Sequence, residues 1–320
     1  MRVFLLLGGF HPEMGEKEAE ALGLSVEERT GRLLIGEVKN PEVLGRLGYS
    51  RWVCEFKDFE CRDFSWVRTP YAVRVRALVK VEDFEKLKSK LEDMVWLSLP
   101  EPKVDLENPK DVVVFIITEK GILCGRELFN FSSKEFTKRH IKNRPFFYPI
   151  SLHPRESRCL VNLSGVRPNE KLLDPFCGTG GILLEAALMG IDSYGLDIRR
   201  DMVKGSKKNL KAFGVSATIL QGDARRIEKV YDFKFDAVVT DPPYGTASSL
   251  CGAEREELYR DSLKSIHSVL KPGKRCVMCA PQELNLEKIL RDLNLFKIKW
   301  KFSERVHKNL TREIFVLEKS

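Results

Sequence analysis

The segment LLDPFCGTGGILLEAA, residues 172–187, joins an apolar, strand-like start to a glycine-rich turn and a helix-forming run. Asp174 stands where the strand should end, and Gly178, Gly180 and Gly181 follow it. Glycines let the backbone approach a ligand closely. The turn lacks the GKS or GKT ending of a P-loop, and its glycines are not in the GxGxxG register of dinucleotide enzymes. The segment predicts a ligand-binding turn between a strand and a helix; a purely structural turn is the alternative.

Strand-like and helix-like runs alternate around this segment, from residue 151 to residue 320. The expected strands are residues 171–173, 193–196, 217–220, 235–240, 275–280, 296–302 and 313–317. The expected helices are residues 180–189, 201–213, 254–270 and 284–293. Strands separated by helix-length runs predict an α/β domain with a doubly wound, mostly parallel sheet, here of seven strands. The last two strands have no helix-length run between them, which predicts an antiparallel hairpin.

Acidic residues end four successive strands of this expected sheet. Asp174 is followed by Asp197, Asp223 and Asp241 in equivalent positions. Because ligands of open α/β sheets bind at the carboxyl ends of the strands, we expect the four carboxylates to line one binding edge. A single Asp in such a place is most often a helix cap. Four in succession favour a nucleoside, with Asp197 accepting the ribose hydroxyls and Asp223 an adenine amino group.

The fourth of these positions opens the tetrapeptide Asp241-Pro242-Pro243-Tyr244, which Gly245 follows. In this stiff turn the Asp241 carboxylate and the Pro242 carbonyl can accept the two N–H bonds of a planar amine. Tyr244 can stack on the ring that carries it. The lone pair of an aromatic amine is delocalised into its ring, so the amine is a poor nucleophile. Hydrogen bonds that hold its two N–H groups favour a more nucleophilic nitrogen. We expect proximity and electrostatics to supply most of the rate enhancement. A simple β-turn is the alternative interpretation.

These motifs resemble the Rossmann-like class I methyltransferases that use S-adenosylmethionine, and in that family a (D/N/S)PP(Y/F/W) motif marks members that methylate an exocyclic amine. Residues 151–163 resemble the family's helical segment before the first strand. The resemblance implies that Asp241, Pro242, Pro243 and Tyr244 are catalytic. It implies a set of cofactor-binding residues, namely His153, Asp174, Phe176, Cys177, Gly178, Thr179, Gly180, Asp197, Ile198, Asp223 and Ala224. Cys177 lies in the cofactor loop and not in the fourth-strand motif, so cytosine C5 chemistry is disfavoured.

The first 150 residues are organised differently. Residues 1–57 show the β-α-β-β-α-β order of a ferredoxin-like domain. Residues 58–130 resemble a THUMP domain, an RNA-binding module of tRNA-modifying enzymes. Residues 131–150 are expected to form a stiff linker to a methyltransferase domain at 151–320. We therefore predict an α+β region, ferredoxin-like and THUMP-like, before the α/β domain.

The charge distribution favours a polyanionic partner. The net charge of +8 divides into −3 for residues 1–60, +4 for residues 61–150 and +7 for residues 151–320. Basic side chains of the middle part are expected to contact RNA phosphates, namely Arg74, Arg76, Lys134, Lys138, Arg139, Lys142 and Arg144. A solvated helix or strand face is the alternative for each of them.

Composition disfavours several other classes of protein. The longest apolar runs are too short to span a bilayer, and residues 1–10 lack the cleavage site of a signal peptide. Among the eight cysteines, Cys276 and Cys279 form a CxxC pair inside an apolar run, with no histidine at zinc spacing. We therefore expect no metal site, no membrane association and a reducing, cytoplasmic location.

Over nearly its whole length the chain resembles the archaeal THUMP-domain tRNA methyltransferases that act on guanosine 10. The resemblance implies methylation of the exocyclic N2 amine of a tRNA guanosine, once or twice, with S-adenosylmethionine as donor. The sequence leaves open N2-methylation at tRNA position 6 or in rRNA, adenine-N6 methylation of a nucleic acid, and a catalytically inactive RNA-binding protein. The resemblance also implies tRNA as partner, a chain that is monomeric on its own and, as in some relatives, a small zinc-containing activator.

Overall fold

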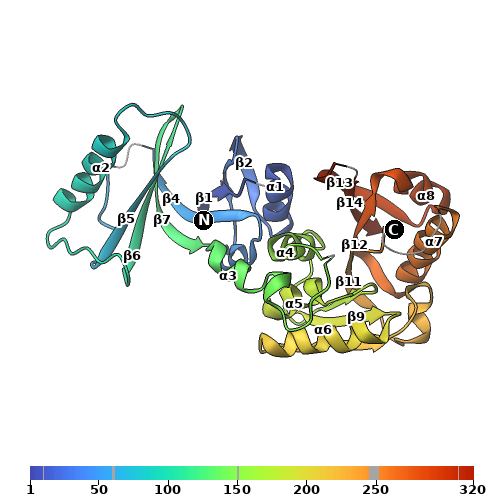
Figure 1. The fold of residues 1–320 in the computed structure, drawn as a ribbon. Coiled ribbons are helices and arrows are strands. Elements are labelled where there is room, and N and C mark those ends of the chain that lie inside the picture. The colour runs from blue at the N-terminus through green and yellow to red at the C-terminus, as the bar shows by residue number, and fades with distance from the viewer. Residues whose placement is uncertain (10, 60–61, 150, 245–251, 309) are drawn as a thin grey trace. The chain divides into compact units, whose positions relative to one another are not determined.

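The computed structural model describes residues 1–320 except 10, 60–61, 150, 245–251 and 309, so Gly245 lies outside the described residues. The chain forms two compact units (Figure 1). The first comprises Met1–Gly45 and Ser50–Ser132, and the second comprises Arg46–Tyr49 and Ser133–Ser320. Each unit contains a seven-stranded sheet. None of the helices formed by described residues combines the length and the apolar character that crossing a membrane requires.

The amino-terminal half of the first unit has the split β-α-β order that its sequence predicts. Its elements are β1 (Arg2–Leu7), α1 (Pro12–Ala21), β2 (Ser25–Thr30), β3 (Leu33–Glu37), the 3-10 helix η1 (Pro41–Arg46) and β4 (Ser50–Asp58). The strands lie in the order β2-β3-β1-β4, and every neighbouring pair is antiparallel. Strand β1 is buried almost throughout because five of its six residues, RVFLLL, are apolar. It forms the centre of this half.

The same sheet continues into the second half of the unit. Its elements are β5 (Tyr71–Ala77), α2 (Phe84–Ser98), β6 (Asp111–Thr118) and β7 (Gly121–Asn130). Strand β7 pairs with β4, β6 pairs with β7, and β5 runs parallel to β6 at the edge. Helix α2 places Leu91 and Val95 in one buried cluster with Tyr71 and Phe115. Strands from the predicted ferredoxin-like and THUMP-like parts thus share one sheet, and the domain boundary at residue 57 stays a prediction.

The second unit is the doubly wound α/β domain that the sequence predicts. Its strands are β8 (Lys171–Asp174), β9 (Asp192–Asp197), β10 (Thr218–Gln221), β11 (Phe235–Thr240), β12 (Leu270–Pro281), β13 (Phe296–His307) and β14 (Leu310–Lys319). They lie in the order β10-β9-β8-β11-β12-β14-β13. The first five are parallel, whereas β14 runs antiparallel to both β12 and β13. The seven-stranded Rossmann-like sheet and its final hairpin are therefore confirmed.

The helices of the second unit cover its sheet, and those between β8 and β12 connect its parallel strands (Figure 1). They are α3 (Ser133–Lys138), η2 (Ile141–Asn143), α4 (Pro154–Leu163), α5 (Gly181–Leu188), α6 (Arg200–Ala212), η3 (Ala224–Lys229), α7 (Gly252–Val269), η4 (Gln282–Leu284) and α8 (Leu286–Leu293). Helix α4 packs beside α5, α5 beside α6, and α7 beside α8. All six residues of β11, FDAVVT, are buried, as expected for a central strand with both faces covered. The residues after β11 are thereby held on a rigid support.

The four predicted carboxylates lie at one edge of this sheet. Asp174 and Asp197 are the last residues of β8 and β9. Asp223 lies two residues beyond the end of β10, and Asp241 lies one residue beyond the end of β11. Because these four strands are parallel neighbours, their carboxyl ends meet at the same edge. This edge is the candidate site.

Candidate active site

Asp174 ties the glycine-rich loop to the neighbouring strand. Its Oδ1 accepts hydrogen bonds from the backbone N–H of Phe176 (3.1 Å) and from the hydroxyl of Thr240 (2.8 Å). The side chain is buried, with 2% of its surface exposed. Burial raises the pKa of Asp174 to about 7, and the carboxylates of Asp241 and Asp197 add to that shift while the two hydrogen bonds oppose it. Asp174 is therefore a structural acid that holds the loop against β11.

Two glycines of the loop adopt the left-handed conformation that favours glycine. The φ angles of Gly178 and Gly180 are +48° and +79°. A Cβ on Gly180 would also lie 2.8 Å from Cδ1 of Leu210 and 3.0 Å from Cβ of Ser206, both on α6. Glycine at this position thus allows both the turn and the close packing of α6 against the start of α5.

Cys177 in the same loop points into the protein. Its Sγ lies 3.2 Å from the position that a Cβ on Gly195 of β9 would occupy. Burial raises the pKa of the Cys177 thiol well above its usual range, and the nearby Asp174 and Asp197 raise it further. A buried, protonated thiol is a poor nucleophile. The structure therefore gives Cys177 a packing role under the loop.

At the end of β9, the carboxylate of Asp197 is followed by the apolar side chain of Ile198. The Asp197 carboxylate accepts from the backbone N–H of Gly178 (2.9 Å, to Oδ2) and from that of Arg199 (2.9 Å, to Oδ1). Burial raises its pKa, and both hydrogen bonds oppose the shift. Beside it the Ile198 side chain is 63% exposed. An oriented carboxylate next to an exposed apolar side chain can bind a ribose and cover the face of a base.

Asp223 is held by a neighbouring arginine. Its Oδ1 accepts from the Arg225 backbone N–H (2.9 Å), and the Arg225 guanidinium contacts both oxygens at 2.7–3.0 Å. The hydrogen bonds from Arg225 hold the pKa of Asp223 below its usual value. Ala224, which follows, is buried. Asp223 is thus an oriented, ionised acceptor at the third strand end.

The tetrapeptide at 241–244 takes part in a partly buried network. The Tyr244 hydroxyl donates to Oδ1 of Asp241, and the Arg312 Nε donates to the Tyr244 hydroxyl oxygen (2.8 Å). The Arg312 Nη1 also forms an ion pair with Glu156 of α4. From α7, Arg255 donates to the Tyr244 carbonyl (2.6 Å). The hydroxyl of Tyr244 is thus bonded to Asp241. Stacking of the Tyr244 ring on the substrate base stays a prediction.

Two acids of this network are shifted toward their protonated forms. Burial raises the pKa of Asp241, while Arg312 and the Tyr244 hydrogen bond oppose the shift. Burial raises the pKa of Glu156 to about 8; Arg312 opposes that shift, and Glu304 and Asp241 add to it. Arg312 is the cation placed among these acids. Glu156 and Arg312 were missed by sequence reasoning. Glu156 lies in the segment singled out before the first strand, whereas nothing in the sequence marks Arg312.

The other predicted cofactor residues lie around the same loop. Thr179 is buried, and its carbonyl accepts from the Asn209 side chain (3.0 Å). Phe176 is half-buried. His153 is the N-cap of α4 and accepts from the Arg155 backbone N–H through Nδ1 (3.2 Å). The His153 imidazole thus has a structural role at the start of α4, and its contact with a cofactor remains a prediction.

Two of the predicted RNA-binding residues require correction. Arg139 is 9% exposed and forms a two-pronged ion pair with Glu185 (2.6 and 3.3 Å). Arg144 is 5% exposed. Both side chains are buried in the second unit, so they do not belong to an exposed phosphate-binding surface.

The remaining basic residues stay candidates. Lys134, Lys138 and Lys142 are exposed. In the first unit, Arg74 and Arg76 on β5 are half-buried, and Arg74 lies 3.7 Å from Glu127. Their contact with RNA remains a prediction.

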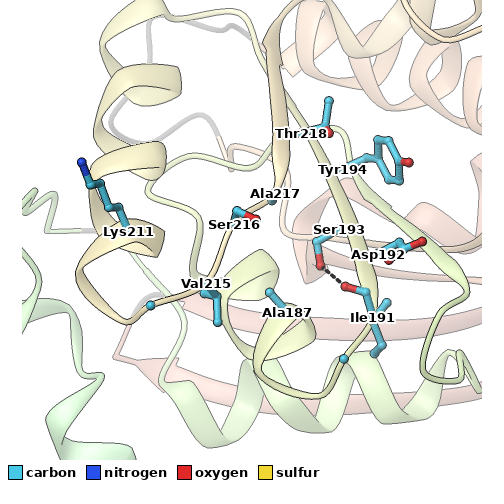
Figure 2. A pocket seen from close by; sticks show the side chains of 12 residues that line it. Ala187, Ile191, Asp192, Ser193, Tyr194, Lys211, Val215, Ser216, Ala217 and Thr218 are labelled. Atoms are coloured by element: carbon cyan, nitrogen blue, oxygen red, sulfur yellow. Dashed lines mark hydrogen bonds between the residues drawn. The ribbon is translucent and has the colours of Figure 1, made fainter.

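A surface hollow of about 820 Å³ lies at the opposite end of the strands (Figure 2). Its lining residues include Asp192 and Tyr194 of β9, Thr218 at the start of β10, and Lys211 of α6. Because parallel α/β sheets bind ligands at the other edge, we do not assign the active site to it. Within the described part of the chain no group of three or more His, Cys, Asp and Glu residues could hold a metal ion.

Comparison with known proteins agrees with this geometry. Residues 142–314 match the UPF0020 family, described as an RMKL-like methyltransferase domain. The chain is 36% identical to the tRNA (guanine(10)-N2)-dimethyltransferase of Methanothermobacter thermautotrophicus, with 100% of both chains covered. It is 35% identical to the protein of the same name from Pyrococcus abyssi, with 97% of both chains covered.

Solved structures show the same fold. TrmN from Thermus thermophilus superposes with a TM-score of 0.56 at 21% identity, and the alignment covers 100% of both chains. At this identity the likeness concerns the fold alone. The alignment includes residues of both units.

Proposed function

Because the chain belongs to the family of tRNA (guanine(10)-N2)-dimethyltransferases, we propose that it methylates the exocyclic N2 amine of guanosine 10 in tRNA. The methyl donor is S-adenosylmethionine, and the product is the mono- or dimethylated guanosine. The observation that carries the proposal is the half-buried Asp241 just beyond the end of β11, on the sheet edge that Asp174, Asp197 and Asp223 also line.

The residues at this edge fit S-adenosylmethionine. Asp197 offers an oriented carboxylate for ribose hydroxyls, and the 63% exposed Ile198 offers an apolar surface for adenine. Asp223 offers an ionised acceptor for the adenine amino group. The glycine loop at 178–180 leaves room for the methionine part. When bound, the cofactor supplies an electrophilic methyl group on its sulfonium sulfur.

Asp241 and Pro242 position the amine. The Asp241 carboxylate and the Pro242 carbonyl accept one N–H bond each, which fixes the nitrogen and makes its lone pair more available. The bond from Tyr244 uses one acceptor site of Asp241, and a carboxylate has about four. A strong base is not required before attack. The methylated nitrogen then loses one proton, which Asp241 can accept because burial raises its pKa.

The substrate base must leave its stack to reach the half-buried Asp241 carboxylate. We infer that the exposed Lys134, Lys138 and Lys142 contact tRNA phosphates. We infer that Arg74 and Arg76 of the first unit contact other phosphates of the tRNA.

A cytoplasmic location belongs to the same proposal. We also infer a chain that is monomeric on its own. The zinc-containing activator is tested by assaying the purified chain alone: full activity would show that this chain needs none.

The proposal is tested by product analysis. The protein is incubated with methyl-labelled S-adenosylmethionine and an unmodified tRNA transcript, an rRNA fragment or single-stranded DNA, and the nucleosides are then identified. We expect N2-methylguanosine or N2,N2-dimethylguanosine at position 10, from tRNA alone. Label at position 6 or in rRNA would instead support another guanine-N2 substrate, and N6-methyladenine would support the adenine alternative. Retained tRNA binding without label in any substrate would indicate an inactive RNA-binding protein.

A further inference from the structure

The hairpin of β13 and β14 extends beyond the end of its neighbour β12. The pairing of β14 with β12 ends where Arg312 lies opposite Pro281, the last residue of β12. Beyond this pair, β13 and β14 continue together as far as His307 and Leu310. Residues 305–308, 310 and 311, which we call the hairpin tip, therefore project roughly 10 Å past the end of β12, because a strand rises about 3.3 Å per residue.

The base of the hairpin tip is bonded to the tetrapeptide at the candidate site. Arg312 Nε donates to the Tyr244 hydroxyl oxygen (2.8 Å), and that hydroxyl donates to Oδ1 of Asp241. Strands β11 and β12 are parallel, with Thr240 opposite Met278, so their carboxyl ends meet at the same edge of the sheet. The hairpin tip thus begins beside Asp241 and projects to the side on which such sheets bind ligands.

The hairpin tip is basic and exposed. It contains Arg305, His307 and Lys308 and no acidic residue, and these three side chains are exposed. Within the described part of the chain, neither Arg305 nor Lys308 forms an ion pair. Glu304, which precedes the tip, lies 3.7 Å from Nη1 of Arg312. The tip therefore presents two uncompensated positive charges to solvent.

The cations in the middle of β13 are different, because acidic side chains neutralise them. Lys301 Nζ lies 2.7 Å from carboxylate oxygens of both Glu287 and Glu313. Lys299 Nζ lies 3.4 Å from Glu318. These lysines have counter-ions within the protein, whereas Arg305 and Lys308 are available for an external anion.

We propose that the hairpin tip binds backbone phosphates of the substrate RNA next to the target guanosine. This inference rests on the proposed function. A base held at Asp241 remains joined through its ribose to phosphates that stay outside the pocket, and the hairpin tip is a basic surface beside that pocket. Because phosphates carry no base identity, Arg305 and Lys308 position the RNA and do not select the base.

The first experiment measures tRNA methylation by the full chain with Arg305→Gln and Lys308→Gln combined. We expect the KM for tRNA to rise roughly 5- to 30-fold, with the Kd of S-adenosylhomocysteine unchanged in calorimetry. The slope of log K against log salt for tRNA binding should fall by roughly 1.5 to 2. The matched control combines Arg167→Gln, before β8, with Lys297→Gln, near the start of β13. Both side chains are exposed and lie toward the opposite end of the strands, so this variant should keep the KM of the unsubstituted protein.

The second experiment locates the contact on the RNA. The photoreactive residue p-benzoylphenylalanine replaces Val306, which is 42% exposed within the hairpin tip. On irradiation with tRNA we expect crosslinks to nucleotides adjacent to the methylated guanosine. The same residue in place of Lys297 should give no crosslink at those nucleotides.

Each outcome supports or overturns the assignment. An unchanged KM and salt slope for the tip variant, or crosslinks only at nucleotides distant from the methylated one, would overturn it and leave the hairpin tip to a different partner, such as an acidic protein surface. Equal losses in the tip variant and the matched control would also overturn it, because net charge and not the tip would then attract the RNA. Failure of the unsubstituted protein to methylate tRNA would instead contradict the proposed function itself.

Discussion

Ionisation of the buried Asp174 carboxyl group should destabilise the protein as the pH rises, and replacing Asp174 by Asn should remove this loss of stability. Burial raises the pKa of Asp174 from 3.8 to about 7. Between these values the folded protein keeps a proton that the unfolded chain has released, so the free energy of unfolding falls as pH rises through this range. One pKa unit corresponds to about 1.4 kcal/mol, and integration from about pH 5 to about pH 8 gives a loss of about 2.5 kcal/mol from this residue.

Asparagine keeps the local contacts but cannot ionise. Its Oδ1 can still accept from the Phe176 N–H and the Thr240 hydroxyl, as that of Asp174 does. The stability of Asp174→Asn relative to the unsubstituted protein should therefore improve by about 2.5 kcal/mol over this pH range. Urea unfolding followed by circular dichroism at several pH values measures that difference. Asp192→Asn, at an exposed position where β9 begins, is the control. A stability difference independent of pH would refute the reasoning about burial.

Three further predictions concern catalysis, the acidic network and RNA binding. Asp241→Asn should lower the methylation rate by about 100-fold or more while S-adenosylhomocysteine still binds in calorimetry; near-normal rates would contradict its catalytic role. Arg312→Met should destabilise the protein by about 3 kcal/mol in urea unfolding, because Glu156 and Asp241 lose their shared cation, and adding Glu156→Gln should recover part of that loss. Replacing Lys134 and Lys142 together by Gln should weaken tRNA binding and reduce its dependence on salt, with the slope of log K against log salt falling by roughly 1 to 2; an unchanged slope would remove these lysines from the interface.

The sequence predicted the sheet and its acidic edge because both depend on local patterns. Apolar runs such as that of β11, followed by Asp241, identify a strand and its end without knowledge of the partners. The parallel arrangement then brings Asp174, Asp197 and Asp223 to the same edge. The final hairpin was predictable for the same reason, since no helix-length run separates its strands.

The residues whose surroundings the sequence predicted wrongly, and those that it did not identify, have partners that are distant in the sequence. Arg139 and Arg144 belong to a basic run that suggests a solvated face, but they are buried in a cluster with Glu185, which is contributed by a later helix. Arg312 and Glu156 are 156 positions apart, and their ion pair joins β14 to α4. A run of charges read along one sequence shows neither its burial nor its counter-ions.

The most direct test of the central claim replaces the target amine. A tRNA transcript is prepared with inosine at position 10, which lacks the exocyclic N2 amine of guanosine and keeps the rest of the base. Transfer of labelled methyl groups to this transcript and to the guanosine transcript is measured under the same conditions. We predict label on guanosine 10 and none on the inosine transcript, with both transcripts binding equally. Equal labelling of the two would contradict methylation of guanine N2 at this position.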